Sequence, residues 1–240
     1  MLRISEKFYE NTYSPGHKSK MPPGIAGKLF KFLRPFESYR EKVVLDLLPA
    51  GNRLLDIGCG EGHLVFDSLS KYKYAFGADV AGTRLSKAKR KLQKLDSDLK
   101  SRIFFRQSDA DLALPFSKAY FDSVTIIAVL EHLFDPYRVI GEVRRVLKKD
   151  GILIIEVPNI GFLPRRLALL FGRLPVTSED EAGWDGGHLH YFTPASLKTL
   201  LENYNFKVNK ITCSGIFAPF RSFWVSLLGG DIIIKAVLKG

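Results

Sequence analysis

The chain has 240 residues and a mass of 27.0 kDa, with 46% hydrophobic and 25% charged residues. This composition is typical of one globular domain with additions, and it excludes a disordered chain, a collagen and a coiled coil. Two cysteines are too few for a disulfide scaffold or a structural zinc site, and we expect no metal site. A net charge of +11 favours anionic partners such as nucleic acid, a lipid surface or an acidic small molecule.

Hydropathy and the N-terminal residues indicate the cellular location of the protein. The longest apolar run, residues 124–130, is far short of the about 20 residues that a transmembrane helix needs. Residues 1–10 carry charges where a signal peptide has an apolar centre. We therefore expect a cytoplasmic protein without a transmembrane segment.

Taken in chain order, the first 150 residues alternate between strand and helix patterns. Residues 1–36 are basic and rich in turn signals, which predicts an N-terminal arm whose Tyr9 and Tyr13 are candidate lid residues. Helices are expected over 37–48, 83–95 and 135–147, the last one capped by Asp135. Strands are expected over 53–57, 74–79, 103–106, 123–130 and 152–157. This alternation predicts βαβ units and a parallel sheet with helices on both faces.

The alternation breaks over residues 158–194, which we expect to cover a substrate. A short apolar and basic helix over 164–171 ends at Gly172, and a loop with Trp184, His188 and His190 follows. Thr193 then begins another helix, and strands over 207–212 and 231–238 flank an aromatic segment. We treat residues 1–240 as a single domain with an arm (1–36) and an insertion (158–194).

The strongest motif is the turn G-C-G-E-G, Gly58 to Gly62, which directly follows a predicted strand. Small residues there allow a nucleotide-like ligand to approach the backbone. The dinucleotide fingerprint G-x-G-x-x-G does not fit, because its third glycine position is His63, and no G-K-[ST] follows for a phosphate loop. An ordinary tight turn is the alternative explanation of this motif.

Two acidic residues follow the next two predicted strands. Asp79 ends the second strand, where a carboxylate can accept both hydroxyls of a ribose. Asp109 follows the third, where it can accept from an adenine amino group. Each is also typical of a cap or a turn, but together with the glycines they favour a ligand site at the carboxyl ends of the strands.

Five segments in order resemble the motifs of class I S-adenosylmethionine-dependent methyltransferases, over about residues 40–210: LLDIGCGEG, FGADVAGTRLSKAK, QSDADLALPF, FDSVTIIAVLEHLFDP and LKKDGILIIEVPN. The resemblance implies an α/β, Rossmann-like three-layer sandwich with a seven-stranded, mostly parallel sheet of order 3-2-1-4-5-7-6, strand 7 antiparallel. The segments FGRLPVT and WDGGHLHYFTP are similar to small-molecule methyltransferases of the ubiquinone-biosynthesis type, and also to the methionine-biosynthesis protein W family. Asn205 stands where those relatives usually carry glycine, and asparagine tolerates the same left-handed conformation.

The resemblance further implies the cofactor S-adenosylmethionine, its product S-adenosylhomocysteine, and the residues that hold them. The implied cofactor residues are Asp56, Gly58, Cys59 and Gly60 at the methionine moiety, Asp79 at the ribose, Val80 packed on the adenine, Asp109 and Ala110 beside the adenine, and Ala128 and Val129 closing the site after the fourth strand.

An oxygen or nitrogen acceptor often needs a base, and histidine titrates in a suitable range. His132 follows the fourth strand and is expected to face the cleft. His188 and His190 lie two apart and, in an extended chain, point to the same side. Structural hydrogen bonding is the alternative role for each, and a zinc site formed by these histidines is a further alternative that no cysteine spacing supports. We favour His190 for the substrate contact because specificity usually lies in loops.

Arg165, Arg166 and Trp184 are candidate substrate residues in the insertion. The basic, apolar helix that carries the arginines is suited to cover an anionic or partly apolar acceptor, or to make peripheral contact with an anionic membrane. An ordinary packed lid helix is the alternative interpretation.

These patterns predict an enzyme that transfers a methyl group from S-adenosylmethionine to oxygen or nitrogen of a small molecule. An RNA or other nucleic-acid methyltransferase is the alternative that the charge suggests. Against it, the segment after the fourth strand reads AVLEH instead of the [DNS]-P-P-[YFW] of amino-methylating DNA enzymes. A non-catalytic partner protein with the same fold is a third alternative, disfavoured because a scaffold does not need the glycines and Asp79.

Overall fold

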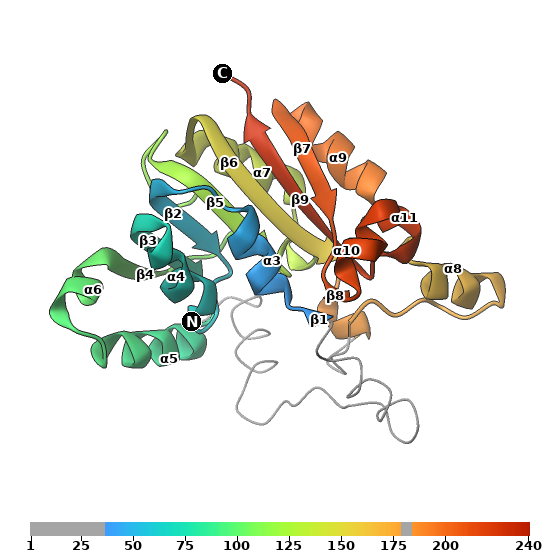
Figure 1. Ribbon diagram of the computed structural model, residues 1–240, viewed down its shortest axis with the longest axis horizontal. Helices are drawn as coiled ribbons and strands as arrows, with labels where there is room; N and C mark the ends of the chain where they lie inside the picture. The colour runs from blue at the N-terminus through green and yellow to red at the C-terminus, as the bar shows by residue number, and fades with distance from the viewer. Residues whose placement is uncertain (1–36, 179–183) are drawn as a thin grey trace.

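The computed structural model describes residues 37–178 and 184–240, and its centre is a seven-stranded sheet covered by helices (Figure 1). Strand β9 runs antiparallel to both of its neighbours, and the other neighbouring pairs are parallel. Numbered among these seven alone, the order is 3-2-1-4-5-7-6 with strand 7 antiparallel, which confirms the predicted architecture. In sheet order the strands are β4 (Ile103–Gln107), β3 (Tyr72–Asp79), β2 (Gly51–Ile57), β5 (Phe121–Ile127), β6 (Leu147–Pro158), β9 (Asp231–Leu238) and β7 (Phe206–Thr212).

Helices cover both faces of the sheet because its central strands are apolar on both sides. Helices α7 (Pro136–Val146) and α9 (Pro194–Asn203) pack on one face, in a core that includes Leu55 and Ile155. Helices α3 (Arg40–Leu47), α4 (His63–Asp67) and α5 (Gly82–Gln93) pack on the other, in cores that include Leu54 and Ile154. Successive residues of a strand face opposite sides, so β2 and β6 are buried on both.

Local signals in the sequence set several of the element ends. The carboxylate of Asp135 accepts from the backbone N of Arg138 at 3.0 Å, which confirms the predicted cap of α7. Thr193 and Ser196 form a capping box at the start of α9. Asn205 adopts the left-handed conformation expected of it, with φ +66°.

The predicted carboxyl end of the fourth strand is wrong. Residues 123–130 were expected to be extended, but β5 ends at Ile127 and Ala128 adopts φ +51°. The backbone N of Ala128 donates to the carbonyl of Glu156 on β6 at 3.1 Å, and the chain then forms the short helix η3 (Leu130–His132). The apolar run continues past the strand because Leu130 is buried under this turn.

The remaining elements lie around the edges of the sheet. Figure 1 shows α6 (Ser97–Arg102) near β4, and α8 (Leu163–Leu170), α10 (Ala218–Arg221) and α11 (Val225–Leu228) on the opposite side of the molecule. The short helix η2 (Ser68–Ser70) contacts β3 and α4, and η5 (Ser222–Trp224) contacts α10 and β7. Helix η4 (Trp184–Gly187) precedes α9 in the chain. Strands β1 (Glu37–Ser38) and β8 (Gly215–Ile216) form a separate antiparallel pair, which no sequence pattern indicated. Within 37–178 and 184–240, no helix has the length and apolar character to cross a bilayer. The arm with Tyr9 and Tyr13 lies outside the described residues.

Candidate functional site

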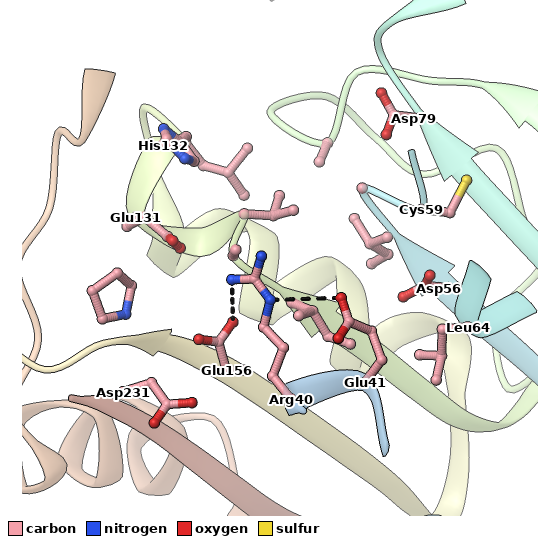
Figure 2. A pocket seen from close by; sticks show the side chains of 18 of the residues that line it. Arg40, Glu41, Asp56, Cys59, Leu64, Asp79, Glu131, His132, Glu156 and Asp231 are labelled. Atoms are coloured by element: carbon pink, nitrogen blue, oxygen red, sulfur yellow. Dashed lines mark ion pairs between the residues drawn. The ribbon is translucent and has the colours of Figure 1, made fainter. Parts of the chain in front are cut away.

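A cleft of about 1040 Å³ opens where the central strands end (Figure 2). Figure 2 shows Asp79, Cys59 and Asp56 on one side of it and Glu131, His132 and Glu156 on the other. Parallel strands bring their carboxyl ends to one edge of the sheet, so residues distant in sequence meet there. The sequence-predicted cofactor residues that line the cleft are Asp56, Gly58, Cys59, Asp79, Val80, Asp109, Ala110, Ala128 and Val129, whereas Gly60 does not line it.

Asp79 joins two loops of the site through its carboxylate. One oxygen accepts from the backbone N of Gly60 at 2.7 Å, and the other from the backbone N of Ala81 at 2.8 Å. The side chain is buried but borders the cleft. A carboxylate has about four lone-pair positions, so Asp79 can accept two more hydrogen bonds from a ligand. Gly60 therefore contributes to the cleft indirectly, through its hydrogen bond to the Asp79 carboxylate.

Two glycines of the turn adopt left-handed conformations, and a Cβ at Gly58 would also meet a short branched side chain, whereas a Cβ at Gly60 would meet only the flexible end of Arg84. Gly58 has φ +73°, and a Cβ there would lie 2.1 Å from Cγ2 of Val129. Gly60 has φ +53°, and a Cβ there would lie 2.3 Å from Nη2 of Arg84. Arg84 comes from α5 and also lines the cleft. Sequence reasoning missed it, because it stands among the lysines and arginines of a solvated helix face.

Asp56 is a buried acid beneath the glycine turn. Its Oδ1 accepts from Oγ1 of Thr125 on β5 at 2.7 Å, and burial raises the pKa of Asp56 to about 7. Cys59 lies close by, and burial together with the charges of Asp56 and Asp79 raises the pKa of its thiol far above the usual range. Cys59 is therefore a neutral packing residue, and thiolate chemistry at this position is disfavoured.

The other end of the cleft carries two buried glutamates. Both carboxylate oxygens of Glu131 and Oε2 of Glu156 lack a hydrogen-bond partner among the described residues. Nη1 of Arg40 lies 3.8 Å from Oε2 of Glu156, and burial nevertheless raises the pKa of Glu156 to about 7. Burial and the neighbouring Glu156 raise the pKa of Glu131 well above its usual range. The signal for Glu156 was present in the sequence, as the one acid in the apolar run ILIIEV.

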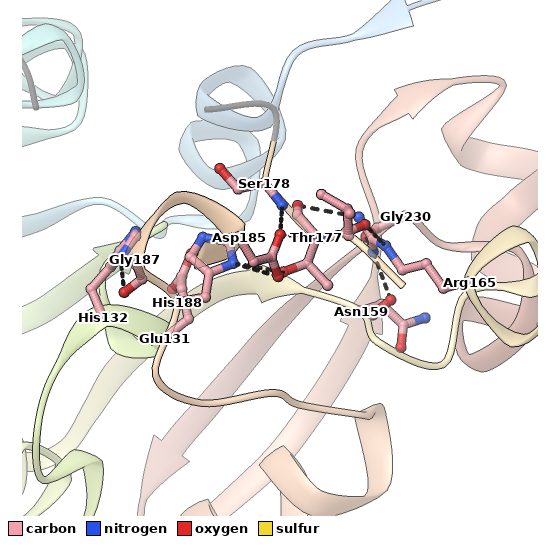
Figure 3. A network of polar contacts seen from close by, with 11 residues as sticks. Glu131, His132, Asn159, Arg165, Thr177, Ser178, Asp185, Gly187, His188 and Gly230 are labelled. Atoms are coloured by element: carbon pink, nitrogen blue, oxygen red, sulfur yellow. Dashed lines mark hydrogen bonds and ion pairs between the residues drawn. The ribbon is translucent and has the colours of Figure 1, made fainter. Parts of the chain in front are cut away.

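His132 and His188 meet beside Glu131 (Figure 3). Their ring centroids are 4.6 Å apart, and Nδ1 of His132 lies 3.3 Å from the carbonyl oxygen of Gly187. Nδ1 of His188 is 2.6 Å from Oγ1 of Thr177, and its Nε2 is 4.0 Å from Oε1 of Glu131. Both histidines line the cleft, so the structure brings together two of the three predicted base candidates.

The same cluster has the composition of a metal site. One potential ligand atom from each of Glu131, His132 and His188 lies within 4.8 Å of the other two. A carboxylate and two imidazoles are ligands that divalent transition metals prefer. We expected no metal site from the sequence, because His188 lies 56 positions from His132 and no cysteine spacing accompanies them.

His190 lies elsewhere. Its Nε2 is 3.4 Å from the carbonyl oxygen of Phe134, and it is not among the described residues that line the cleft. Of the two loop histidines, His188 therefore lines the cleft and His190 does not. The backbone N groups of Leu189 and His190 both donate to the carbonyl of Glu131. The side chain of the candidate Trp184 lies outside the described part of the chain.

The two candidate substrate arginines bind the backbone of the protein itself. Arg165 Nη1 donates to the carbonyls of Asn159 and Gly230, both at 2.7 Å. Arg166 donates to the carbonyls of Gly161 and Ser226. Arg165 lines the cleft and Arg166 does not. Both side chains brace the insertion, so neither is arranged as a clamp for an anionic ligand.

Comparisons with known proteins agree with this geometry. A family model described as a methyltransferase domain matches residues 28–211. The 27-O-demethylrifamycin SV methyltransferase of Amycolatopsis mediterranei is 34% identical over 113 residues, 45% of this chain but only 39% of that protein. The ubiquinone biosynthesis O-methyltransferase of Xanthomonas axonopodis pv. citri is 31% identical over 189 residues, which cover 76% of this chain and 73% of that protein. A structure titled as a SAM-dependent methyltransferase, possible histamine N-methyltransferase, from Thermotoga maritima shares the fold, with a TM-score of 0.62, 20% identity and full coverage of both chains.

Proposed function

We propose that this chain, which belongs to the class I S-adenosylmethionine-dependent methyltransferases, transfers the methyl group to an oxygen or nitrogen atom of a small molecule. The observation that carries the proposal is a single cleft with two different ends, one built on the glycine turn and Asp79, the other on Glu131, His132 and His188. When bound, S-adenosylmethionine supplies a methyl group on a positively charged sulfur and leaves as S-adenosylhomocysteine. Relatives named for O-methylation of small molecules support this acceptor class over a nucleic acid.

The residues of the first end fit the cofactor. Asp79 retains acceptor capacity for the two hydroxyls of a ribose, and the glycine turn lets a ligand approach the backbone. Asp56, once ionised, favours a positively charged group in the cleft. Val80, Asp109 and Ala110 line the side expected to hold the adenine, and Ala128 and Val129 separate this end from the acceptor. Positioning of this kind supplies much of the acceleration of a displacement reaction.

The residues of the second end suit an acceptor that donates hydrogen bonds. Glu131 and Glu156 are buried and have oxygens without a hydrogen-bond partner within 37–178 and 184–240, so an acceptor hydroxyl or amino group would satisfy them. His188 is held in place by Thr177 and is the histidine best placed to take the acceptor's proton. Arg165 is committed to backbone carbonyls and Arg40 lies beside the carboxylates of Glu156 and Glu41, so we propose a neutral or cationic acceptor in preference to the anionic one that the net charge suggested.

A divalent cation bound at this second end is an alternative to a histidine base for activating the acceptor. The unpartnered oxygens of Glu131, together with His132 and His188, would hold it. Such an ion would orient the acceptor oxygen and ease loss of its proton. In that case the histidines act as ligands and not as bases.

One experiment tests the proposal and separates these alternatives. The purified protein is incubated with methyl-labelled cofactor and with separated metabolite and RNA fractions of a cell extract. We expect label in the metabolite fraction; label confined to RNA supports the nucleic-acid alternative, and absence of label from both, with intact cofactor binding, supports a non-catalytic protein.

On an identified acceptor, His188→Ala is expected to reduce turnover by about 10²–10⁴-fold, whereas the matched control His190→Ala retains most of it. Prior treatment with a chelator distinguishes the two chemistries. If the chelator abolishes activity and added manganese or zinc restores it, His132 and His188 are ligands of a cation. If activity is unchanged, His188 acts as the base that takes the proton.

A further inference from the structure

Asp185 is a buried acid three residues before His188, in a turn with an unusual backbone. Only 1% of its side chain is exposed. It adopts φ +46° and ψ 44°, and Gly186 and Gly187 follow with φ +68° and φ +81°. A residue with a side chain is strained in this left-handed region, and such strain persists where the surrounding contacts hold it. The contacts of the Asp185 carboxylate therefore indicate what the turn is built to do.

Three hydrogen bonds hold the carboxylate of Asp185 against Thr177 and Ser178 (Figure 3). Its Oδ1 accepts from the backbone N of Thr177 at 2.7 Å and from the backbone N of Ser178 at 2.8 Å. Its Oδ2 accepts from the hydroxyl of Thr177 at 2.6 Å. The carboxyl group of aspartate is ionised at neutral pH, so both oxygens can only accept. The single hydroxyl hydrogen of Thr177 is therefore directed at Asp185.

This direction decides which ring nitrogen of His188 carries the hydrogen. Oγ1 of Thr177 lies 2.6 Å from Nδ1 of His188 as well. A hydroxyl group has one hydrogen and two lone pairs, and the hydrogen is already used toward Asp185. Oγ1 can therefore only accept from the ring, so Nδ1 is the donor. Because a neutral imidazole has one N–H group, Nε2 of His188 keeps a lone pair.

Nε2 is the nitrogen of His188 on the side of the buried glutamate. It lies 4.0 Å from Oε1 of Glu131, and both residues line the cleft. The partner of one ring nitrogen fixes the role of the other. A lone pair on Nε2 can take a proton from an acceptor or bind a cation, whereas an Nε2–H group can do neither.

We propose that Asp185, acting through Thr177, is a positioning residue that sets the tautomer of His188, with the hydrogen on Nδ1 and the lone pair of Nε2 toward the cleft. The inference rests on the proposed function for the use that is made of this lone pair. The tautomer itself is a property of the protein without any acceptor. A contact that only braces the loop is the competing explanation, and it does not require this order of hydrogens.

Nuclear magnetic resonance of the complete protein, with isotope-labelled histidine nitrogens at about pH 8, measures the tautomer because a ring nitrogen shifts strongly when it carries hydrogen. His188→Gln identifies the signals of His188, which should report hydrogen on Nδ1 in the unsubstituted chain. Asp185→Asn should reverse the order. The two backbone N–H groups hold the amide oxygen at the Oδ1 position, so the amide nitrogen donates to Oγ1 of Thr177. The threonine hydrogen then turns to Nδ1, and the ring hydrogen moves to Nε2.

Two control variants separate the tautomer from bracing. Thr177→Ser keeps the hydroxyl group and should keep hydrogen on Nδ1 of His188. Ser178→Ala keeps the backbone donor to Asp185 and should leave the His188 signals unchanged. On an acceptor identified by labelling, Asp185→Asn should lower turnover by about 10²–10⁴-fold, as His188→Ala does, while Thr177→Ser retains most of it.

The outcomes distinguish this inference from the proposed function. Hydrogen on Nε2 or on both nitrogens of the unsubstituted chain, or an Asp185→Asn protein that keeps hydrogen on Nδ1, overturns the inference. If Asp185→Asn does not fold, Thr177→Val decides, since without Oγ1 both tautomers of His188 should appear, and an unchanged Nδ1–H overturns the inference. The expected tautomers in a protein that transfers no methyl group support the inference and refute the proposed function.

Discussion

Replacing Asp56 by Asn is expected to stabilise the ligand-free protein above neutral pH. Burial raises the pKa of Asp56 from 3.8 to about 7, so the folded chain holds this proton more tightly than the unfolded chain does. The contribution of Asp56 to stability is therefore greatest below about pH 4, falls as the pH rises, and levels off above about pH 7. Each tenfold difference in proton affinity corresponds to about 1.4 kcal/mol, so the ionised carboxylate lowers the unfolding free energy by at most about 4 kcal/mol.

Thermal unfolding between about pH 5 and pH 8.5, without cofactor, measures this effect. The unfolding temperature of Asp56→Asn should exceed that of the unsubstituted chain by as much as about 8–16 °C at the alkaline end, and the difference should shrink toward acid pH. Thr125→Val is the matched control. It removes the hydroxyl that stabilises the ionised form, so it should destabilise the protein more at alkaline than at acid pH. An Asp56→Asn effect that is equal at both ends of the range refutes the reasoning.

The same variant should have the opposite effect on the proposed cofactor. A cation in the cleft binds better when Asp56 is ionised, so the affinity of the unsubstituted chain for S-adenosylmethionine should fall as the pH drops below about 7. Asp56→Asn should bind more weakly at alkaline pH and lose this pH dependence. Calorimetry over the same pH series provides the measurement.

Three further substitutions, one of them with a control, test the site and the fold. Gly58→Ala should destabilise the protein in a denaturant titration by more than the about 1–2 kcal/mol of a left-handed alanine, because the new Cβ meets Val129. The control Gly172→Ala, at φ +70° and with no described atom within 4 Å of the new Cβ, should show only the conformational cost. Asp79→Ala should weaken cofactor binding at least about tenfold by calorimetry, and unchanged affinity would contradict its assignment to the ribose. Asn205→Gly should raise the unfolding free energy by up to about 1 kcal/mol, since glycine adopts φ +66° without strain; a decrease would mean that the asparagine side chain contributes a contact of its own.

Much of the fold could be predicted because its determinants are local. Continuous apolar runs such as residues 152–157 indicate strands covered on both faces, and an Asp-Pro or Thr-Pro pair marks the start of a helix. The glycine turn and Asp79 were found for a similar reason, since each directly follows a strand and successive parallel strands end at one edge. The family resemblance then supplied the strand order, which the pattern of elements alone leaves open.

The acceptor end of the cleft depended on the tertiary structure. Glu131, Glu156 and His188 belong to three separate segments, and the left-handed turn at Ala128 that brings Glu131 over the sheet is made by a hydrogen bond to β6. Burial changes the chemistry of these groups as well, since the pKa of a carboxyl group in water says nothing about its value away from solvent.

The sequence by itself determined the class of fold, the order of its elements along the chain and the end of the cleft built on the glycine turn, because periodicity, caps and glycine turns act between residues close along the chain. Only the tertiary structure decided that His188 faces the cleft while His190 turns to a backbone carbonyl, and that Arg165 and Arg166 brace the insertion. The pairing of hydrogen-bond donors with acceptors depends on distances between segments that are far apart in the sequence. In a buried site, those distances determine whether a polar side chain is satisfied by the protein or remains available to a ligand.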